Sequence, residues 1–116
     1  MLKITSRTDN EKNISIIYLD GHIETNSFQA FEQELNNMLK QKFFKIIINC
    51  SDLKYINSAG LGVIVGLIEE IRDQNGDIKF CCMNENVSKI FDLVGFNQCF
   101  KIFDKEEQAI NAFEQN

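Results

Sequence analysis

The chain has 116 residues, of which 44% are hydrophobic, a composition typical of one globular domain over residues 1–116. Its net charge of −5 argues against nucleic acid or an anionic membrane as a partner, because both select for clustered lysine and arginine. A cytoplasmic location is expected, since no signal-peptide pattern and no apolar run near the roughly 20 residues that span a bilayer occur.

Two short strands are predicted at the start of the chain. Leu2 and Ile4 alternate with polar neighbours, and residues 8–13 are typical of a turn. Residues 14–19 predict a second strand, antiparallel to the first because the linker is too short for a crossover, and Gly21 is expected to end it. A helix should follow, capped by Asn26 or Ser27 and carrying apolar residues at helical spacing: Phe28, Phe31, Leu35, Met38 and Leu39.

The middle of the chain predicts a buried strand, a loop and a long helix. Residues 43–48 are nearly all apolar, which indicates a central strand covered on both faces. Residues 50–56 are expected to form a loop. The helix begins near Ser58, and Asn75-Gly76 predicts its end in the left-handed conformation.

The last third repeats this alternation. Residues 78–83 predict a strand and residues 100–103 a short final strand. The helix between them is capped by Asn84 or Asn86 and closed by Gly95, and the final helix has Asp104 and Glu107 as a capping pair and carries Ala109, Ile110 and Phe113. The order predicts an α/β sandwich with a mixed sheet of about five strands and about four helices, in which an antiparallel hairpin precedes parallel crossovers.

The sequence offers no pattern for a metal, redox or cofactor site. Cys50, Cys81, Cys82 and Cys99 contain no C-x-x-C pair, and they are expected to be small buried residues in a reducing compartment. His22, the single histidine, has no cysteine or histidine companion.

Ser58 lies between a strand-like run and a helical pattern, within Asn57-Ser58-Ala59-Gly60-Leu61-Gly62. Its hydroxyl is expected at a helix N-terminus, where free N–H groups and the macrodipole favour a phosphate or another anion. Serine is also one of the commonest N-cap residues, so capping is the alternative interpretation.

Three glycines occur within this helical pattern: Gly60, Gly62 and Gly66. Each costs about 1 kcal/mol relative to alanine in a helix interior, so a compensating role is expected. A helical wheel places Leu61, Ile64, Val65, Ile68 and Ile71 on a core stripe, and Ala59, Gly62, Val63, Gly66 and Glu70 on the opposite face. That face predicts a smooth docking surface. The alternative is that the glycines let the helix lie close to its own sheet.

Two segments resemble the STAS domain, the family of bacterial anti-sigma factor antagonists and of the cytoplasmic domains of sulphate transporters. They are Leu19-Asp20-Gly21-His22-Ile23-Glu24-Thr25-Asn26 and Tyr55-Ile56-Asn57-Ser58-Ala59-Gly60-Leu61-Gly62, the second of which is similar to the family's phosphorylation loop. The closing Leu93-Val94-Gly95-Phe96 also follows the family pattern, so the resemblance covers essentially the full chain.

The resemblance implies a STAS fold and an anti-sigma factor antagonist without enzymatic activity. The implied partner is an anti-sigma factor that is also a serine kinase, whose binding frees the sigma factor and whose phosphorylation of Ser58 ends the association. A serine phosphatase as a second partner stays open. The residues assigned to partner binding are Glu24, Thr25, Asn26, Asn57, Ser58, Ala59, Gly60, Gly62, Val63 and Gly66.

Two positions depart from the family, because Asn57 and Asn49 stand where aspartate is usual. Loss of the carboxylate at position 57 is compatible with weaker kinase recognition of Ser58 and also with weaker repulsion of a partner. Asparagine can still bond the local backbone.

Three alternatives remain to be weighed. A hydrolase nucleophile elbow has glycine two residues before its serine, where this chain has Ile56. A phosphoacceptor receiver domain needs acidic residues at its strand ends, where this chain has Asn49 and Cys50. A STAS module that docks without phosphorylation, as a constitutive scaffold, is the third.

Overall fold

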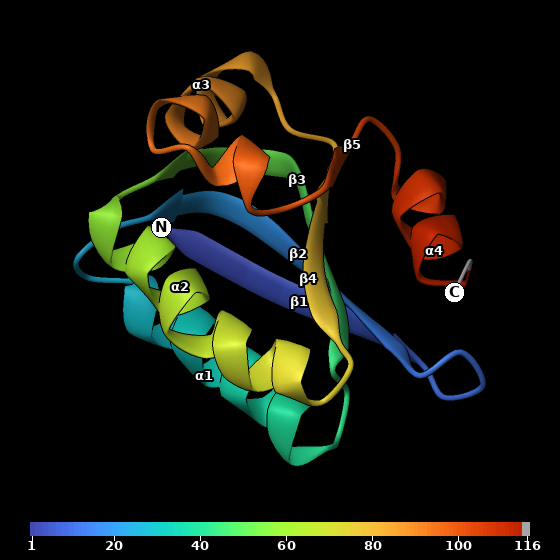
Figure 1. Cartoon of the computed structure of the whole chain (residues 1–116). Helices are drawn as coiled ribbons and strands as arrows, with labels where there is room; N and C mark the ends of the chain where they lie inside the picture. The colour runs from blue at the N-terminus through green and yellow to red at the C-terminus, as the bar shows by residue number, and fades with distance from the viewer. Residues whose placement is uncertain (115–116) are drawn as a thin grey trace.

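The computed structural model describes residues 1–114. Their strands form one five-stranded sheet with the order β1-β2-β3-β4-β5 (Figure 1). β1 and β2 pair in antiparallel fashion, and every other pairing is parallel. The strands are β1 (Leu2–Asp9), β2 (Ile14–Ile23), β3 (Lys45–Ile56), β4 (Asp77–Cys81) and β5 (Ile102–Phe103). The predicted mixed sheet with an antiparallel first hairpin is therefore confirmed.

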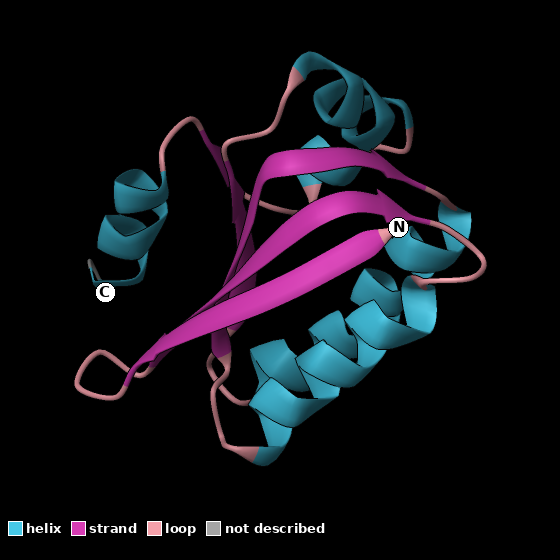
Figure 2. Cartoon of the chain, turned by 180° about the vertical axis from the view of Figure 1, so that it is seen from behind, coloured by secondary structure: helices cyan, strands magenta, loops and turns pink. Residues whose placement is uncertain are grey.

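The helices cover the two faces of the sheet unequally (Figures 1 and 2). Three helices and a short 3₁₀ turn lie over one face: α1 (Phe28–Lys40), α2 (Ser58–Asp73), α3 (Glu85–Leu93) and η1 (Phe96–Gln98). Among the helices of residues 1–114, only α4 (Glu106–Glu114) lies over the other face. No described helix is long and apolar enough to cross a membrane.

Alternation along the strands divides the core between these faces. On β3, Ile46 and Ile48 point into the large cluster beneath α1, α2 and α3, whereas Ile47 points toward α4. Each of these three side chains is at most 1% exposed. The nearly continuous apolar run in β3 thus reflects burial on both sides, as predicted.

The region predicted as a loop at residues 50–56 is strand, which corrects the sequence-based expectation. β3 continues through Leu53 and Ile56, which are buried and pair with Gly21 and Ile23 of β2. The intervening side chains are largely exposed, because α4 does not extend over this part of the sheet. The polar pattern on that uncovered face made the segment look like a loop.

β2 likewise continues beyond its predicted end. Gly21 has a φ of 114°, and the pairing of β2 with β3 shifts register beside it, so the glycine marks a bulge rather than a strand terminus. A Cβ there would collide with the backbone carbonyl of Met1. β1 also runs to Asp9 and so includes Thr8 and Asp9, the first two residues of the region predicted as a turn.

Local helix signals agree with the structure at most ends. Asn75 has a φ of 63° and Gly95 a φ of 79°, as expected after helix C-termini. Asn84 caps α3 by accepting a hydrogen bond from the backbone N–H of Val87 at 2.9 Å. The predicted capping pair of α4, Asp104 and Glu107, was wrong by one residue. The observed pair is Lys105 and Gln108, in which the Gln108 side chain accepts from the backbone N–H of Lys105.

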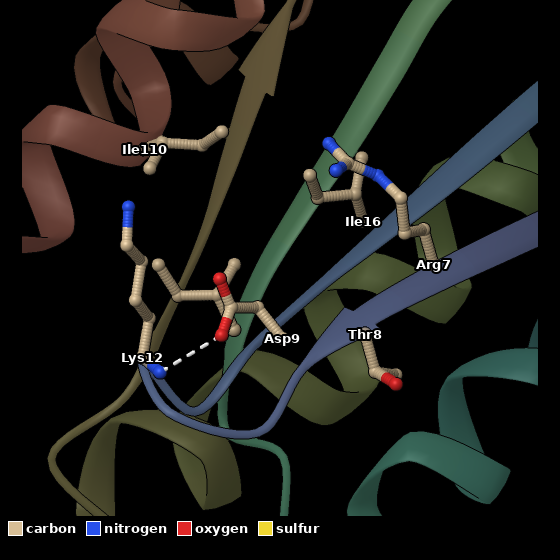
Figure 3. A pocket seen from close by; sticks show the side chains of 7 residues that line it. Arg7, Thr8, Asp9, Lys12, Ile16 and Ile110 are labelled. Carbon is tan, nitrogen blue, oxygen red and sulfur yellow. Dashed lines mark hydrogen bonds between the residues drawn. The ribbon is translucent and has the colours of Figure 1, made fainter.

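Polar contacts join α4 to the first hairpin and to β3. Glu106 accepts hydrogen bonds from Arg7 at 3.1 Å and from Asn49 at 3.0 Å, and Lys12 pairs with Glu114 at 2.7 Å. Figure 3 shows the small pocket between these elements, with Arg7 and Asp9 of β1 turned toward Ile110 of α4 and Thr8 turned away.

Candidate functional site

The two segments that resemble the STAS family, residues 19–26 and 55–62, meet where β2 and β3 end. Ile23 and Ile56 are register partners at the ends of β2 and β3, and the backbone N–H of Asn57 donates to the carbonyl of Ile23 at 2.9 Å. The loop after β2 and the start of α2 are thereby held side by side. Glu24, Thr25 and Asn26 lie in that loop and are exposed.

Ser27 shapes this loop, and the sequence signalled it only as a possible cap. Its hydroxyl accepts a hydrogen bond from the backbone N–H of Glu24 and donates one to the carbonyl of His22, both at 2.9 Å. It is the residue before α1 but makes no side-chain cap bond to that helix. Ser27 therefore fixes the loop that presents Glu24, Thr25 and Asn26.

Asn57, not Ser58, caps α2. The Asn57 side-chain oxygen accepts from the backbone N–H of Gly60 at 3.0 Å, while the Asn57 carbonyl accepts from Leu61. Ser58 is the first helical residue and is exposed, and no hydrogen bond within the described part of the chain holds its hydroxyl. The interpretation of Ser58 as the N-cap is wrong, and its hydroxyl is left accessible to solvent.

The start of α2 offers a favourable setting for negative charge. No acidic residue occupies the first turn of the helix. The helix N-terminus carries about half a positive charge, and backbone N–H groups point outward there. A phosphate on Ser58 would lie at this end of the dipole, so the fold itself can accommodate it.

The three glycines of α2 have different surroundings. A Cβ at Gly60 would lie 2.6 Å from Cγ2 of Ile23 and 2.8 Å from Cγ1 of Ile56, so Gly60 lets the helix start lie against the sheet. A Cβ at Gly62 or Gly66 would meet nothing within 4 Å. Close packing on the sheet thus explains Gly60, whereas Gly62 and Gly66 lie open.

The predicted helix faces were partly wrong. Val63, assigned to the docking face, is 6% exposed and belongs to the core, and Val65, assigned to the core, is 55% exposed. α2 packs against both the sheet and α1, so its buried arc reaches round to Val63 and Leu67. Had Leu67 been counted in the apolar stripe, the helical wheel would have predicted a buried face closer to the observed one.

We define the open face of α2 by the exposed residues Ser58, Gly62, Val65, Gly66 and Glu69. Of the other predicted binding residues, Asn57 and Ala59 are half-buried beside this face, while Gly60 and Val63 point inward. Tyr55, at the end of β3, is 41% exposed and adds an apolar surface that sequence reasoning missed.

The cysteines are less uniformly buried than expected. Cys50 and Cys81 are buried, Cys82 is half-buried and Cys99 is exposed, which corrects the prediction for the last two. Burial raises the pKa of Cys50 to about 12 and also raises that of Cys81. Both thiols are therefore protonated and poorly nucleophilic at neutral pH. Within residues 1–114, no group of His, Cys, Asp or Glu side chains could hold a metal ion.

Comparison with known proteins connects this geometry to a family. The profile of the STAS domain matches residues 6–109. The Anti-sigma F factor antagonist of Paenibacillus polymyxa is 22% identical over 107 residues, covering 91% of this chain and 92% of that protein.

Solved structures share the fold. An anti-sigma factor antagonist from Mycobacterium paratuberculosis superposes with a TM-score of 0.84 at 18% identity, covering 97% of this chain and 96% of that one. SpoIIAA, described as an anti-sigma factor antagonist, has a TM-score of 0.81 in its unphosphorylated form, at 20% identity and with 100% of this chain and 98% of that chain covered. The phosphorylated form of Bacillus SpoIIAA has a TM-score of 0.73 at 19% identity, covering 95% of this chain and 98% of that one.

Proposed function

Because the chain belongs to the STAS domain family, we propose that it is an anti-sigma factor antagonist that binds an anti-sigma factor through the open face of α2. The observation that carries the proposal is the exposed Ser58 at the N-terminus of α2, directly beside Gly62, Val65 and Gly66. The curated relative from Paenibacillus polymyxa bears the same functional name.

The open face suits close protein contact. Nothing lies within 4 Å of where a Cβ would stand at Gly62 or Gly66, so a partner can approach the helix backbone there. Val65 supplies an apolar contact between them, and burying such a side chain fully is worth about 1.5–3 kcal/mol. The exposed loop at Glu24, Thr25 and Asn26 borders the same surface.

Phosphorylation of Ser58 by the partner would end the association. A phosphate adds about −1.5 to −2 charges. The helix N-terminus favours that charge by about 0.3–1 kcal/mol, whereas burial of an unpaired charge in an interface costs several kcal/mol. The second effect is larger, and each 1.4 kcal/mol weakens affinity about tenfold.

The switch is tested by incubating the chain with its cognate kinase and ATP and measuring its intact mass. We expect a gain of one phosphate that Ser58→Ala abolishes. The phosphorylated chain should bind the anti-sigma factor at least tenfold more weakly in calorimetry. Equal affinity of both forms would contradict the switch, and an unchanged mass would favour the constitutive scaffold.

The docking surface is tested separately by Gly62→Arg and Gly66→Arg. A long side chain on the open face should hold the partner away and abolish binding while the domain stays folded. Ala30→Arg, which adds the same side chain to an exposed position of α1, is the matched control. Normal binding by both glycine variants would place the interface elsewhere.

The proposed role is regulatory binding without catalysis. A serine hydrolase would need a base hydrogen-bonded to its nucleophile, and within residues 1–114 no hydrogen bond joins Ser58 to His22, the single histidine. A fluorophosphonate probe for serine hydrolases should leave Ser58 unlabelled. Covalent labelling at Ser58 would argue for an enzyme instead.

A further inference from the structure

β1 is an edge strand of the sheet, and its outer side is unpaired. β1 pairs with β2 over all eight of its residues without a register shift, and β2 is its one substantial neighbour among the described elements. The opposite edge strand, β5, has only two residues. Figures 1 and 2 show β1 as the outermost ribbon of the sheet.

Edge strands are commonly protected by shortness, a bulge, proline or charged side chains. β1 is eight residues long, pairs continuously and contains no proline, so its charged side chains are the one protective feature it has. Residues 5–9 are all exposed. Its outward N–H and C=O groups therefore form a ready template for one more strand.

We propose that β1 pairs antiparallel with β1 of a second copy of this chain, with Ser6 opposite the partner's Ser6. Such pairing needs a two-fold axis normal to the sheet, which keeps each side chain on its own face of the joined sheet. Lys3, Thr5, Arg7 and Asp9 share the face that α4 occupies, as Figure 3 shows for Arg7 and Asp9.

The charges on β1 select this register. With Ser6 at the centre, seven residues pair, and Lys3 lies opposite the partner's Asp9 twice, once on each side of the axis. Centring on Thr5 would place Lys3 opposite the partner's Arg7, and centring on Arg7 would place two arginines opposite each other. Both of these alternatives bring like charges together, which is unfavourable.

The charged groups are available for this pairing. Oδ1 of Asp9 accepts from the backbone N–H groups of Glu11 and Lys12, which leaves Oδ2 for the partner's Lys3. Lys3 forms no ion pair within residues 1–114. Arg7 is already bound to Glu106 and would face the partner's neutral Thr5.

The resulting dimer has one continuous sheet and leaves the open face of α2 accessible, because α2 packs over β3 and β4 rather than beside β1. One strand pair buries less than the roughly 1,200 Å² of a standard interface, so we expect reversible association between about 10 μM and 1 mM. The inference is independent of the proposed function.

Sedimentation equilibrium of the full chain from about 5 μM to 1 mM provides the first test. We expect a monomer–dimer equilibrium that Ser6→Lys abolishes and that Lys3→Asp weakens about tenfold. Adding Asp9→Lys to Lys3→Asp should restore it by reversing each ion pair. A single monomeric species throughout the range, or a dimer unaffected by Ser6→Lys, would overturn the proposal.

Cross-linking tests the register. In a Cys99→Ser background, which removes the exposed native thiol, Ser6→Cys should be joined into covalent dimers by a short bis-maleimide. Thr8→Cys is the matched control, because its thiol lies about 13 Å from its own counterpart in this register. Equal cross-linking of the two variants would overturn the register. Unchanged thermal unfolding of each monomer checks that the fold is intact.

Discussion

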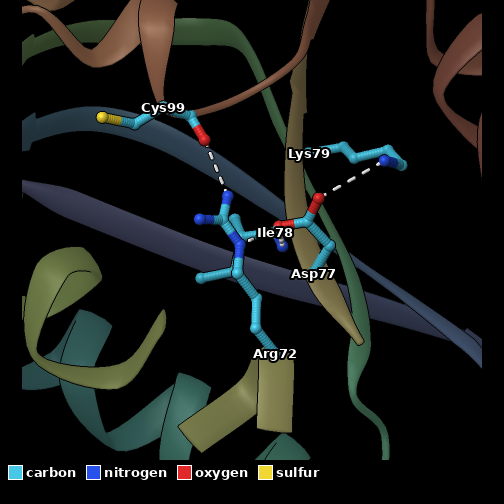
Figure 4. A network of polar contacts seen from close by, with 5 residues as sticks. All are labelled: Arg72, Asp77, Ile78, Lys79 and Cys99. Atoms are coloured by element: carbon cyan, nitrogen blue, oxygen red, sulfur yellow. Dashed lines mark hydrogen bonds and ion pairs between the residues drawn. The ribbon is translucent and has the colours of Figure 1, made fainter. Parts of the chain in front are cut away.

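The two ends of α2 are built in opposite ways. From its start to its middle, Gly62, Val65 and Gly66 lie open, and the Asn57 side chain caps the helix by accepting one hydrogen bond from the backbone N–H of Gly60. At its end, Arg72 donates to Asp77 at 3.0 Å and to the carbonyl of Cys99 at 2.7 Å. Figure 4 shows this network, which Asp77 extends to Lys79.

The end of α2 anchors the helix to the rest of the domain, whereas the residues nearer its start are exposed. Arg72 also lies over the ring of Phe100, with its guanidinium carbon 5.3 Å from the ring centre, so one side chain joins α2 to β4 and to the segment before β5. Because the far end and the buried side of α2 hold it in place, the start of the helix can carry small residues. The following four changes test that separation, in order of decreasing effect on stability.

Gly60→Val should have the largest effect. The added side chain would overlap Ile23 and Ile56, and overpacking of this kind costs about 1–3 kcal/mol of unfolding free energy. The same change at Gly62 meets open space and should raise stability by a few tenths of a kcal/mol, because valine is a better helix former than glycine. Urea unfolding measures both, and equal destabilisation would show that Gly62 is also packed.

Arg72→Ala should lower the unfolding free energy by about 1–2 kcal/mol, since hydrogen bonds from a charged group are lost but the side chain is 42% exposed. Arg72→Lys keeps the charge but lacks the planar guanidinium group, so its unfolding free energy should lie between those of the wild type and Arg72→Ala. Binding to the anti-sigma factor should stay unchanged in calorimetry. A large loss of affinity would mean that the two ends of α2 are coupled.

Asn57→Ala should cost about 1 kcal/mol through loss of the cap on α2. Asn57→Asp retains a capping oxygen and should unfold within a few tenths of a kcal/mol of the wild type. Thermal melts compare the two variants. If both destabilise equally, the bond to Gly60 contributes nothing to stability.

Val65→Ser should have the smallest effect on folding, within about 0.5 kcal/mol, because the side chain is exposed. Under the proposed function it should weaken binding of the anti-sigma factor about tenfold through lost apolar contact. Ser88→Ala, at an exposed position of α3 away from the open face, is a control for binding. Unchanged affinity of Val65→Ser would remove Val65 from the interface.

Strong local patterns carried the prediction of the fold. Neighbouring residues alone determine three of these patterns. They are the apolar run before Asn49, the left-handed signals at Asn75 and Gly95, and the short first linker. The full length of β3 was missed because its end is covered on only one face. That exposure depends on where α4 lies, which no local pattern records.

The residues assigned to partner binding remain a prediction, and the structure adds how they are arranged. The hydrogen bond from Asn57 to Ile23 places the start of α2, with Ser58, beside the loop at Glu24. The exchange of Val63 and Val65 arose because a helix with apolar residues on most sides gives an ambiguous wheel. The contrast between Gly60 and Gly62 depends on the positions of Ile23 and Ile56, which only the packed structure supplies.

The unequal covering of the sheet has a consequence for local opening. Among the described helices, α4 alone shields Ile14, Ile16 and Ile47. Two partly exposed ion pairs, Arg7 with Glu106 and Lys12 with Glu114, attach it to the hairpin. Salt screens such pairs, whereas the larger core beneath the other helices responds little to ionic strength. Amide exchange in α4 should therefore accelerate with added salt well before exchange in α1, making this helix the first cooperative unit to detach.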